Sequence, residues 1–217
     1  MMYEAENGPV LARVPSTSRR ILDVGCGSGA LGRKIKIERN CEVIGITYSE
    51  AEAVLARNHL DDVVVCDLNS FTPNGLLSFD CIVCSHVLEH IADPENLLKA
   101  LLSLLSPDGT LLVALPNVLF WHQRWEFMRG RFKYTDGGLM DRTHYRFFDW
   151  VAARELLINS GYEIVEAAAD GGFPLSRFLF RAGRWLDRVS VKVFPGLFGF
   201  QFIFVCTVAN NRPKFIS

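Results

Sequence analysis

Apolar and polar positions alternate along this chain in two different rhythms. Short apolar runs rich in Val and Ile have the length of buried strands, and segments with apolar residues at helical spacing separate them. Such alternation is typical of right-handed β-α-β units, in which helices cover both faces of a parallel sheet. The predicted strands occupy residues 19–25, 41–47, 62–67, 79–85, 109–116, 162–169 and 198–209.

The clearest helix signal follows the fourth predicted strand. Asp93 can cap this helix and Pro94 suits its first turn. Leucines as far as Leu105 give it an apolar face, and Pro107 ends it. A further helix is expected over 149–160, and the irregular segment before it, 117–148, is rich in aromatic and charged residues.

Composition sets limits on the kind of protein and partner. A chain of 217 residues with 49% apolar content can bury the core of one α/β domain. We expect a single domain over 1–217, with an insertion on the substrate side at about 117–148 and a C-terminal helix and strand at about 174–210. The 23 basic and 24 acidic side chains leave a net charge of −1, so no overall field favours nucleic acid, and we expect a small partner.

The cysteines point to a reducing compartment. Most of the six lie in apolar segments, and no secretory leader precedes them, so we expect a cytoplasmic protein. Cys81 and Cys84 form a lone CxxC, but positions three apart on a strand face opposite sides. We therefore expect neither a redox pair nor a metal site. The apolar run 198–209 is shorter than the ~20 residues that span a bilayer.

The stretch ILDVGCGSGALG, residues 21–32, reads as a strand end, a glycine turn and a helix start. Glycines let a ligand approach the backbone, and a helix N-terminus offers N–H groups to an anion. Asp23 is a carboxylate at the end of a buried strand, a position that favours a ligand with an ammonium group. Gly27, Gly29 and Gly32 also spell the GxGxxG of dinucleotide-binding folds, but that interpretation wants an acidic residue about 20 positions on, where this chain has Thr47.

From about residue 20 to 169 the chain resembles the class I S-adenosylmethionine-dependent methyltransferases, whose DxGxGxG motif stands here as Asp23, Gly25, Gly27 and Gly29. The resemblance implies a Rossmann-like, seven-stranded, mostly parallel sheet with helices on both faces and the last strand antiparallel. It implies S-adenosylmethionine as cofactor and S-adenosylhomocysteine as product. The further cofactor positions that it implies are Cys26, Thr47, Tyr48, Asp67, Leu68, Ser85 and His86. The family usually has an acidic residue at the position of Thr47.

The segments SHVLEHIADPENLL and GRFKYTDGGLMDRTHYRFFD resemble methyltransferases associated with bacterial cell-surface glycan assembly. This resemblance implies methyl transfer to a small molecule or a sugar or glycan intermediate. A looser resemblance, to a methyltransferase-like accessory protein of methionine biosynthesis, keeps a non-catalytic partner as the alternative. A nicotinamide-dependent oxidoreductase is the weaker alternative, carried by the GxGxxG spacing alone.

The insertion supplies the candidate catalytic residues. His144 is the expected base, because imidazole exchanges protons near neutral pH, and Arg146 could hold a carboxylate or phosphate of the acceptor, with Tyr145 between them. The alternative is that DRTHYRFFD only fastens the insertion to the core. His90 is expected to be a packed helix residue.

The segment 176–200 has the pattern of an amphipathic helix. Arg177, Arg181, Arg184 and Arg188 form one stripe, and apolar residues that include Phe178, Trp185 and Val189 lie beside it. This pattern suits a peripheral contact with an anionic membrane, at the inner face of the cell membrane. The alternatives are packing on the domain core or on a second subunit in a homodimer.

Overall fold

The computed structural model describes residues 7–73, 75, 77–174 and 180–209. Within these residues seven strands form one sheet in the order β3-β2-β1-β4-β5-β7-β6. The strands are β1 (Arg20–Val24), β2 (Glu42–Thr47), β3 (Asp62–Val65), β4 (Phe79–Ser85), β5 (Leu105–Pro116), β6 (Tyr162–Gly171) and β7 (Gly199–Val208). The predicted strands are all present, with small shifts at their ends.

The direction of the strands confirms the predicted fold class. Strands β1 to β5 pair in parallel, whereas β7 lies between β5 and β6 and is antiparallel to both. The chain runs outward from β1 to β3 and then returns to β4 on the other side of β1. The carboxyl ends of β1 and β4 therefore form a topological switch point, where open α/β sheets bind their ligands.

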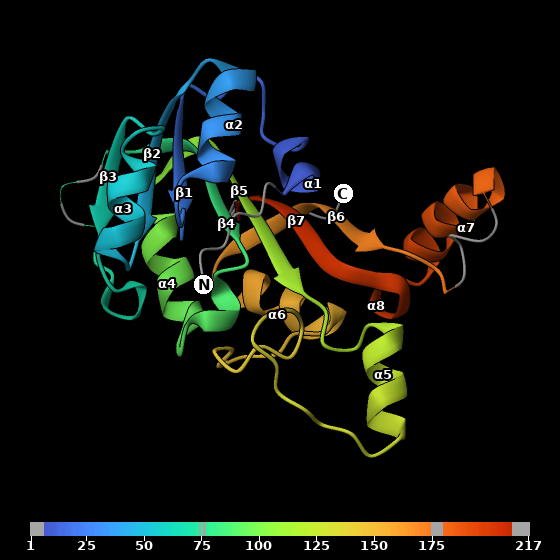
Figure 1. Cartoon of the computed structure of the whole chain (residues 1–217). Helices are drawn as coiled ribbons and strands as arrows, with labels where there is room; N and C mark the ends of the chain where they lie inside the picture. Colours follow the sequence, from blue (N-terminus) through green and yellow to red (C-terminus); the bar gives the residue numbers. More distant parts are fainter. Residues whose placement is uncertain (1–6, 74, 76, 175–179, 210–217) are drawn as a thin grey trace, which may run out of the picture.

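Helices pack on both faces of the sheet (Figure 1). One core cluster contains apolar residues of α4 and α6, and the other contains residues of α1, α2 and α3. Cys84 belongs to the first cluster and Cys81 to the second, so the two cysteines face opposite sides of β4 as predicted. The helices are α1 (Gly8–Leu11), α2 (Ala30–Arg39), α3 (Glu50–Ala56), α4 (Pro94–Leu102), α5 (Trp121–Met128), α6 (Trp150–Asn159), α7 (Phe180–Val193) and α8 (Pro195–Phe198), with 3-10 turns η1 (Leu68–Ser70) and η2 (Leu88–His90).

Local capping explains where the two central helices begin. The Asp93 carboxylate accepts from the Asn96 N–H at the start of α4, and Asp149 accepts from two N–H groups at the start of α6. The prediction that the first of these helices continues to Leu105 was wrong, because it ends at Leu102. Leu105 already pairs with Phe79 as the first residue of β5, across an irregular register that the sequence pattern did not reveal.

The insertion 117–148 leaves β5 at its carboxyl end and returns to α6. It is fastened at its base, where Asn117 and Phe148 form an isolated bridge and the Asn117 side chain donates to the Gly199 carbonyl over 2.7 Å. Figure 1 shows α5 and the loop after it below the sheet, and α7 reaching away from the body of the molecule. No helix in the described part of the chain is long and apolar enough to cross a membrane.

Candidate functional site

The glycine turn between β1 and α2 has a backbone that requires glycine. Gly25, Gly27 and Gly29 have φ angles of +72°, +52° and +86°, in the left-handed region. A Cβ on Gly25 would lie 2.5 Å from Cγ2 of Val87. Gly29 is the N-cap of α2 and no side chain caps this helix, so its first N–H groups can bind a ligand.

Asp23 is buried beside this turn, with 2% of its surface exposed. Its Oδ2 atom has no hydrogen-bond partner among the described residues. Burial raises the pKa of the Asp23 carboxyl to about 7, against a backbone hydrogen bond with Gly32 that lowers it. A buried carboxyl with one unpartnered oxygen, next to a helix N-terminus, fits the ammonium and carboxylate of an amino acid, as the amino acid end of S-adenosylmethionine requires.

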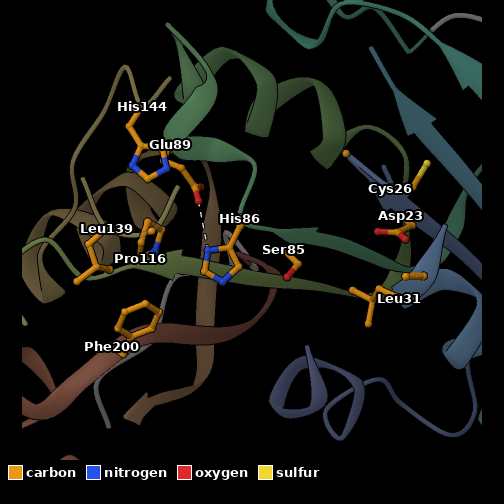
Figure 2. A pocket seen from close by; sticks show the side chains of 13 residues that line it. Asp23, Cys26, Leu31, Ser85, His86, Glu89, Pro116, Leu139, His144 and Phe200 are labelled. Atoms are coloured by element: carbon orange, nitrogen blue, oxygen red, sulfur yellow. Dashed lines mark ion pairs between the residues drawn. The ribbon is translucent and has the colours of Figure 1, made fainter. Parts of the chain in front are cut away.

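A cavity of about 260 Å³ opens beside Asp23 and reaches the insertion. Figure 2 shows Asp23, Cys26 and Leu31 at one end of it and His86, Glu89 and His144 at the other. Its walls come from β1, the glycine turn, the start of α2, the ends of β4 and β5, η2, the insertion and β7. The lining residues are Asp23, Gly25, Cys26, Ala30, Leu31, Ser85, His86, Glu89, Pro116, Gly138, Leu139, His144 and Phe200.

The structure brings part of the predicted cofactor set to this cavity. Asp23, Gly25, Cys26, Ser85 and His86 line it, whereas Gly27 and Gly29 shape the turn behind it. The remaining residues of the set, Thr47, Tyr48, Asp67 and Leu68, lie outside the lining.

Two of the outlying residues follow the neighbouring strands. Tyr48 is 77% exposed just after β2. Asp67 is an exposed N-cap of η1 whose carboxylate accepts from the Asn69 N–H over 2.9 Å. Their expected contacts with the adenine stay predictions.

Thr47 is buried at the end of β2, and its hydroxyl serves another side chain. Its Oγ1 donates to Oε2 of Glu52 over 2.8 Å, and the Ser49 N–H contacts the same hydroxyl at 3.3 Å. The acidic group that the sequence lacks at the end of β2 is therefore supplied from α3. Sequence reasoning missed Glu52, although its position five residues after Thr47 on a capped helix was a usable signal.

His86 stands in a strained and fully engaged position. Its φ angle is +56°, which is unusual for a residue with a side chain. Its Nε2 lies 2.9 Å from Oε1 of Gln201, and its Nδ1 lies 3.3 Å from Oε1 of Glu89. Burial lowers the pKa of His86, but Glu89, aided by Gln201, leaves that pKa above its ordinary value. Sequence reasoning missed both partners.

Of the three expected catalytic residues, only His144 faces the cavity. Burial lowers the pKa of His144, Glu89 opposes this shift and His90 adds to it. Tyr145 is 70% exposed. The Arg146 guanidinium donates two hydrogen bonds to the Ala92 carbonyl, at 3.1 and 2.7 Å, so its contacts favour fastening of the insertion over acceptor binding.

Comparisons with known proteins agree with this geometry. The model of the family described as methyltransferase domain matches residues 4–167, so the chain belongs to that family. Among solved structures of low sequence identity, the fold resembles an S-adenosylmethionine-dependent methyltransferase from Mesorhizobium loti, with a TM-score of 0.64 and 20% identity over 93% of this chain and 97% of that one. A second S-adenosylmethionine-dependent methyltransferase, from Clostridium acetobutylicum, gives a TM-score of 0.63 and 13% identity over 97% of this chain and 93% of that one.

Curated relatives match a shorter part of the chain. The ubiquinone biosynthesis O-methyltransferase of Marinobacter nauticus is 34% identical over 113 residues, which are 48% of this chain and 47% of that protein. The protein of the same name from Xanthomonas campestris is 35% identical over 114 residues, 50% of this chain and 47% of that protein. The chain thus spans about half the length of the curated relatives that it matches.

Family membership confirms the predicted enzyme class, and S-adenosylmethionine, the predicted cofactor, is the one named for these solved neighbours. The match to a methyltransferase family contradicts the alternative of a nicotinamide-dependent oxidoreductase. The names of these relatives refer to ubiquinone biosynthesis and do not support the association with glycan assembly that the sequence suggested.

Proposed function

We propose that this protein transfers the methyl group of S-adenosylmethionine to an oxygen atom of a small-molecule acceptor. One observation carries the proposal: a single cavity joins the buried Asp23, whose Oδ2 atom has no partner among the described residues, to the cluster of His86, Glu89 and His144. A cofactor held at the first end would face an acceptor held at the second. Alignment of this kind can contribute ~7–11 kcal/mol to a displacement reaction.

The residues that would hold the cofactor follow from the site. Asp23 would bind its ammonium, and the N-terminus of α2 its carboxylate. Glu52 would accept hydrogen bonds from the ribose, with Tyr48 and Asp67 farther along toward the adenine. The cofactor supplies an electrophilic methyl group on a sulfonium, and the protein supplies its position.

Apolar walls favour an acceptor with an aromatic or apolar body. Pro116, Leu139 and Phe200 line the cavity near His144, and a neighbouring cavity shares Leu139 and Phe200 and adds Phe120 and Met140. Phe120 and Phe200 meet edge to face, with ring centres 5.7 Å apart. The names of the relatives, which are O-methyltransferases, support an aromatic hydroxyl as the acceptor group.

A glycan intermediate is the second candidate acceptor, and one observation favours it. His122, Arg131 and Lys133 line the neighbouring cavity, where they could bind the phosphate of a nucleotide-linked or lipid-linked sugar.

We further propose that α7 binds peripherally to the surface of an anionic membrane, without crossing it. Trp185 is 65% exposed, and Val189, Val193 and Phe194 are also exposed beside it. Arg184, Arg188 and Lys192 recur every fourth residue along the same helix and are exposed. The predicted Arg177 and Phe178 lie outside the described residues, as does the side chain of Arg181, so the described turns carry this proposal.

The acceptor can be tested with two probes. The protein is incubated with S-adenosylmethionine and either catechol or a nucleotide-linked sugar, and S-adenosylhomocysteine and methylated product are measured by mass spectrometry. We expect an O-methylated catechol that requires Asp23. Product from the sugar alone would select the second acceptor class, and product from neither would count against the proposal.

A further inference from the structure

One buried carboxylate is surrounded by three imidazoles at the acceptor end of the cavity. Glu89, in η2, is 1% exposed. His86 and His90 flank it in sequence, and His144 reaches it from the insertion. Glu89, His90 and His144 each offer a ligand atom, and these atoms lie within 4.8 Å of one another. The rings of His90 and His144 stand edge to face, with centres 4.8 Å apart.

Two of these residues carry buried polar atoms that lack a hydrogen-bond partner. Among the described residues, Oε2 of Glu89 and the buried Nδ1 of His144 have no such partner, and Oε1 of Glu89 meets only the long contact with His86. His86 contributes an ion pair to Oε1 of Glu89 at 3.3 Å. The site thus gathers several lone pairs at one point, and His86 reaches only one oxygen of Glu89. A cation bound at the other side would offset the remaining cost of burying this carboxylate.

Hydrogen bonds fix the tautomer of His90. The Thr143 hydroxyl donates its only proton to Oδ1 of Asp141 over 2.7 Å. Its oxygen lies 3.1 Å from Nδ1 of His90, so this nitrogen must be the donor. Nε2 of His90 then carries the lone pair. Support of a histidine by a hydroxyl and a carboxylate behind it is typical of metal ligands.

We propose that Glu89, His90 and His144 bind a divalent transition metal ion. Two imidazole nitrogens and one carboxylate suit Zn²⁺ or Co²⁺, whose bonds to such ligands measure about 2.0–2.2 Å. The three atoms need to close by a small movement to share one ion. Glu89 and His144 also line the cavity, so a further coordination position would open toward the acceptor. No metal site was predicted here from the sequence, because only the pair Cys81 and Cys84 was considered as metal ligands.

The role of the ion rests on the proposed function, whereas its binding does not. An acceptor hydroxyl bound to the ion has a lowered pKa and loses its proton to water. The oxygen lone pair then forms the bond to the methyl carbon, while the electrons of the carbon–sulfur bond return to sulfur and the sulfonium becomes a thioether. In this role the ion, and not His144, activates the acceptor.

Binding is tested with Co²⁺ as the probe. The chelator-treated and dialysed full chain is titrated with Co²⁺, and visible absorption and calorimetry report the stoichiometry and affinity. We expect one ion per chain, and at least tenfold weaker binding by Glu89→Gln and by His90→Ala. His59→Ala, which removes an exposed histidine elsewhere, is the matched control. Thermal unfolding shows whether each variant folds, and Glu89→Gln keeps the shape of the side chain.

Two results would overturn the metal site: Co²⁺ binding equal in the wild type and Glu89→Gln, or an equal loss in His59→Ala. The role is tested separately on a verified acceptor, where chelation should abolish turnover, leave S-adenosylhomocysteine binding unchanged and be reversed by added metal. Turnover that survives chelation would overturn the proposed role of the ion in activating the acceptor, and His144 would again be the candidate base. Metal binding without any methyl transfer would instead refute the proposed function and leave the site standing.

Discussion

The hydroxyl of Thr47 donates to the carboxylate of Glu52 across 2.8 Å, and this pair joins the end of β2 to the first turn of α3. The bond uses one oxygen of Glu52 and leaves the other for a ligand. We predict that Glu52→Gln weakens S-adenosylhomocysteine binding about tenfold, because charge-assisted hydrogen bonds to the ribose become neutral ones. Calorimetry measures this, with Glu50→Gln as the control. Equal losses in both variants would speak against a specific contact.

Restoring an acidic residue at the end of β2 should fail for the same reason. Thr47→Glu would place a second carboxylate beside Glu52, and like charges at such short range repel. We expect weaker binding of S-adenosylhomocysteine than in the wild type, and recovery in the double variant Thr47→Glu, Glu52→Gln. Tighter binding by the single variant would show that Glu52 does not occupy the ribose position.

The protonation of Asp23 should govern both stability and affinity. Its pKa is raised to about 7, so the ligand-free folded protein holds a proton that the unfolded chain releases above about pH 4. Stability without ligand should therefore fall as the pH rises from about 4 through 7, by a few kcal/mol at most. Ammonium binding needs the ionised form, so S-adenosylhomocysteine affinity should fall as the pH drops below 7. Asp23→Asn should remove both trends in thermal unfolding and calorimetry.

Gly25→Ala should disrupt the glycine turn through a clash as well as through strain. The matched control is Gly130→Ala, since Gly130 has a φ of +71° against +72° for Gly25 but nothing within 4 Å of an added Cβ. In both variants the left-handed backbone conformation should lower the free energy of unfolding by about 1 kcal/mol. Only Gly25→Ala should also lose S-adenosylhomocysteine binding, because its Cβ meets Val87. The same affinity in both variants would contradict the close approach.

His144→Ala should separate cofactor binding from turnover. We expect unchanged S-adenosylhomocysteine binding and a loss of turnover of about 10²-fold or more on a verified acceptor, since the side chain activates the acceptor either as a base or as a metal ligand. Tyr145→Ala, which removes an exposed neighbour, is the control and should retain turnover. A similar small loss in both would assign His144 to fastening of the insertion.

The surface of α7 should bind lipid in a charge-dependent way. Sedimentation with vesicles should show binding to anionic but not neutral lipid, weakened by salt through screening. The double variant Arg184→Gln, Arg188→Gln should bind less than the wild type, and a double variant of the exposed Arg19 and Arg57 to Gln controls for net charge. Concentration-dependent dimerisation without lipid binding would assign this face to a second copy of the chain.

Local patterns sufficed for the sheet but not for the full site. Period and turn signals located the strands, and Asp23 with its glycines was recognisable because motif and function share one short segment. Gln201 could not be foreseen, since it stands 115 residues from His86 and reaches it only because β7 inserts beside β5. Glu89 and His144 likewise meet only through the return of the insertion, which no periodic pattern predicts.

The position of β7 also makes two parts of the molecule depend on one strand. Within the described residues β6 pairs with β7 alone, and β7 is the strand that is synthesised after the six others of the sheet. Until it arrives, β6 has no partner in the sheet, the cavity lacks the wall formed by Phe200, and His86 lacks Gln201. The glycine turn between β1 and α2 does not depend on β7, but the cavity beside it is complete only when β7 has joined the sheet.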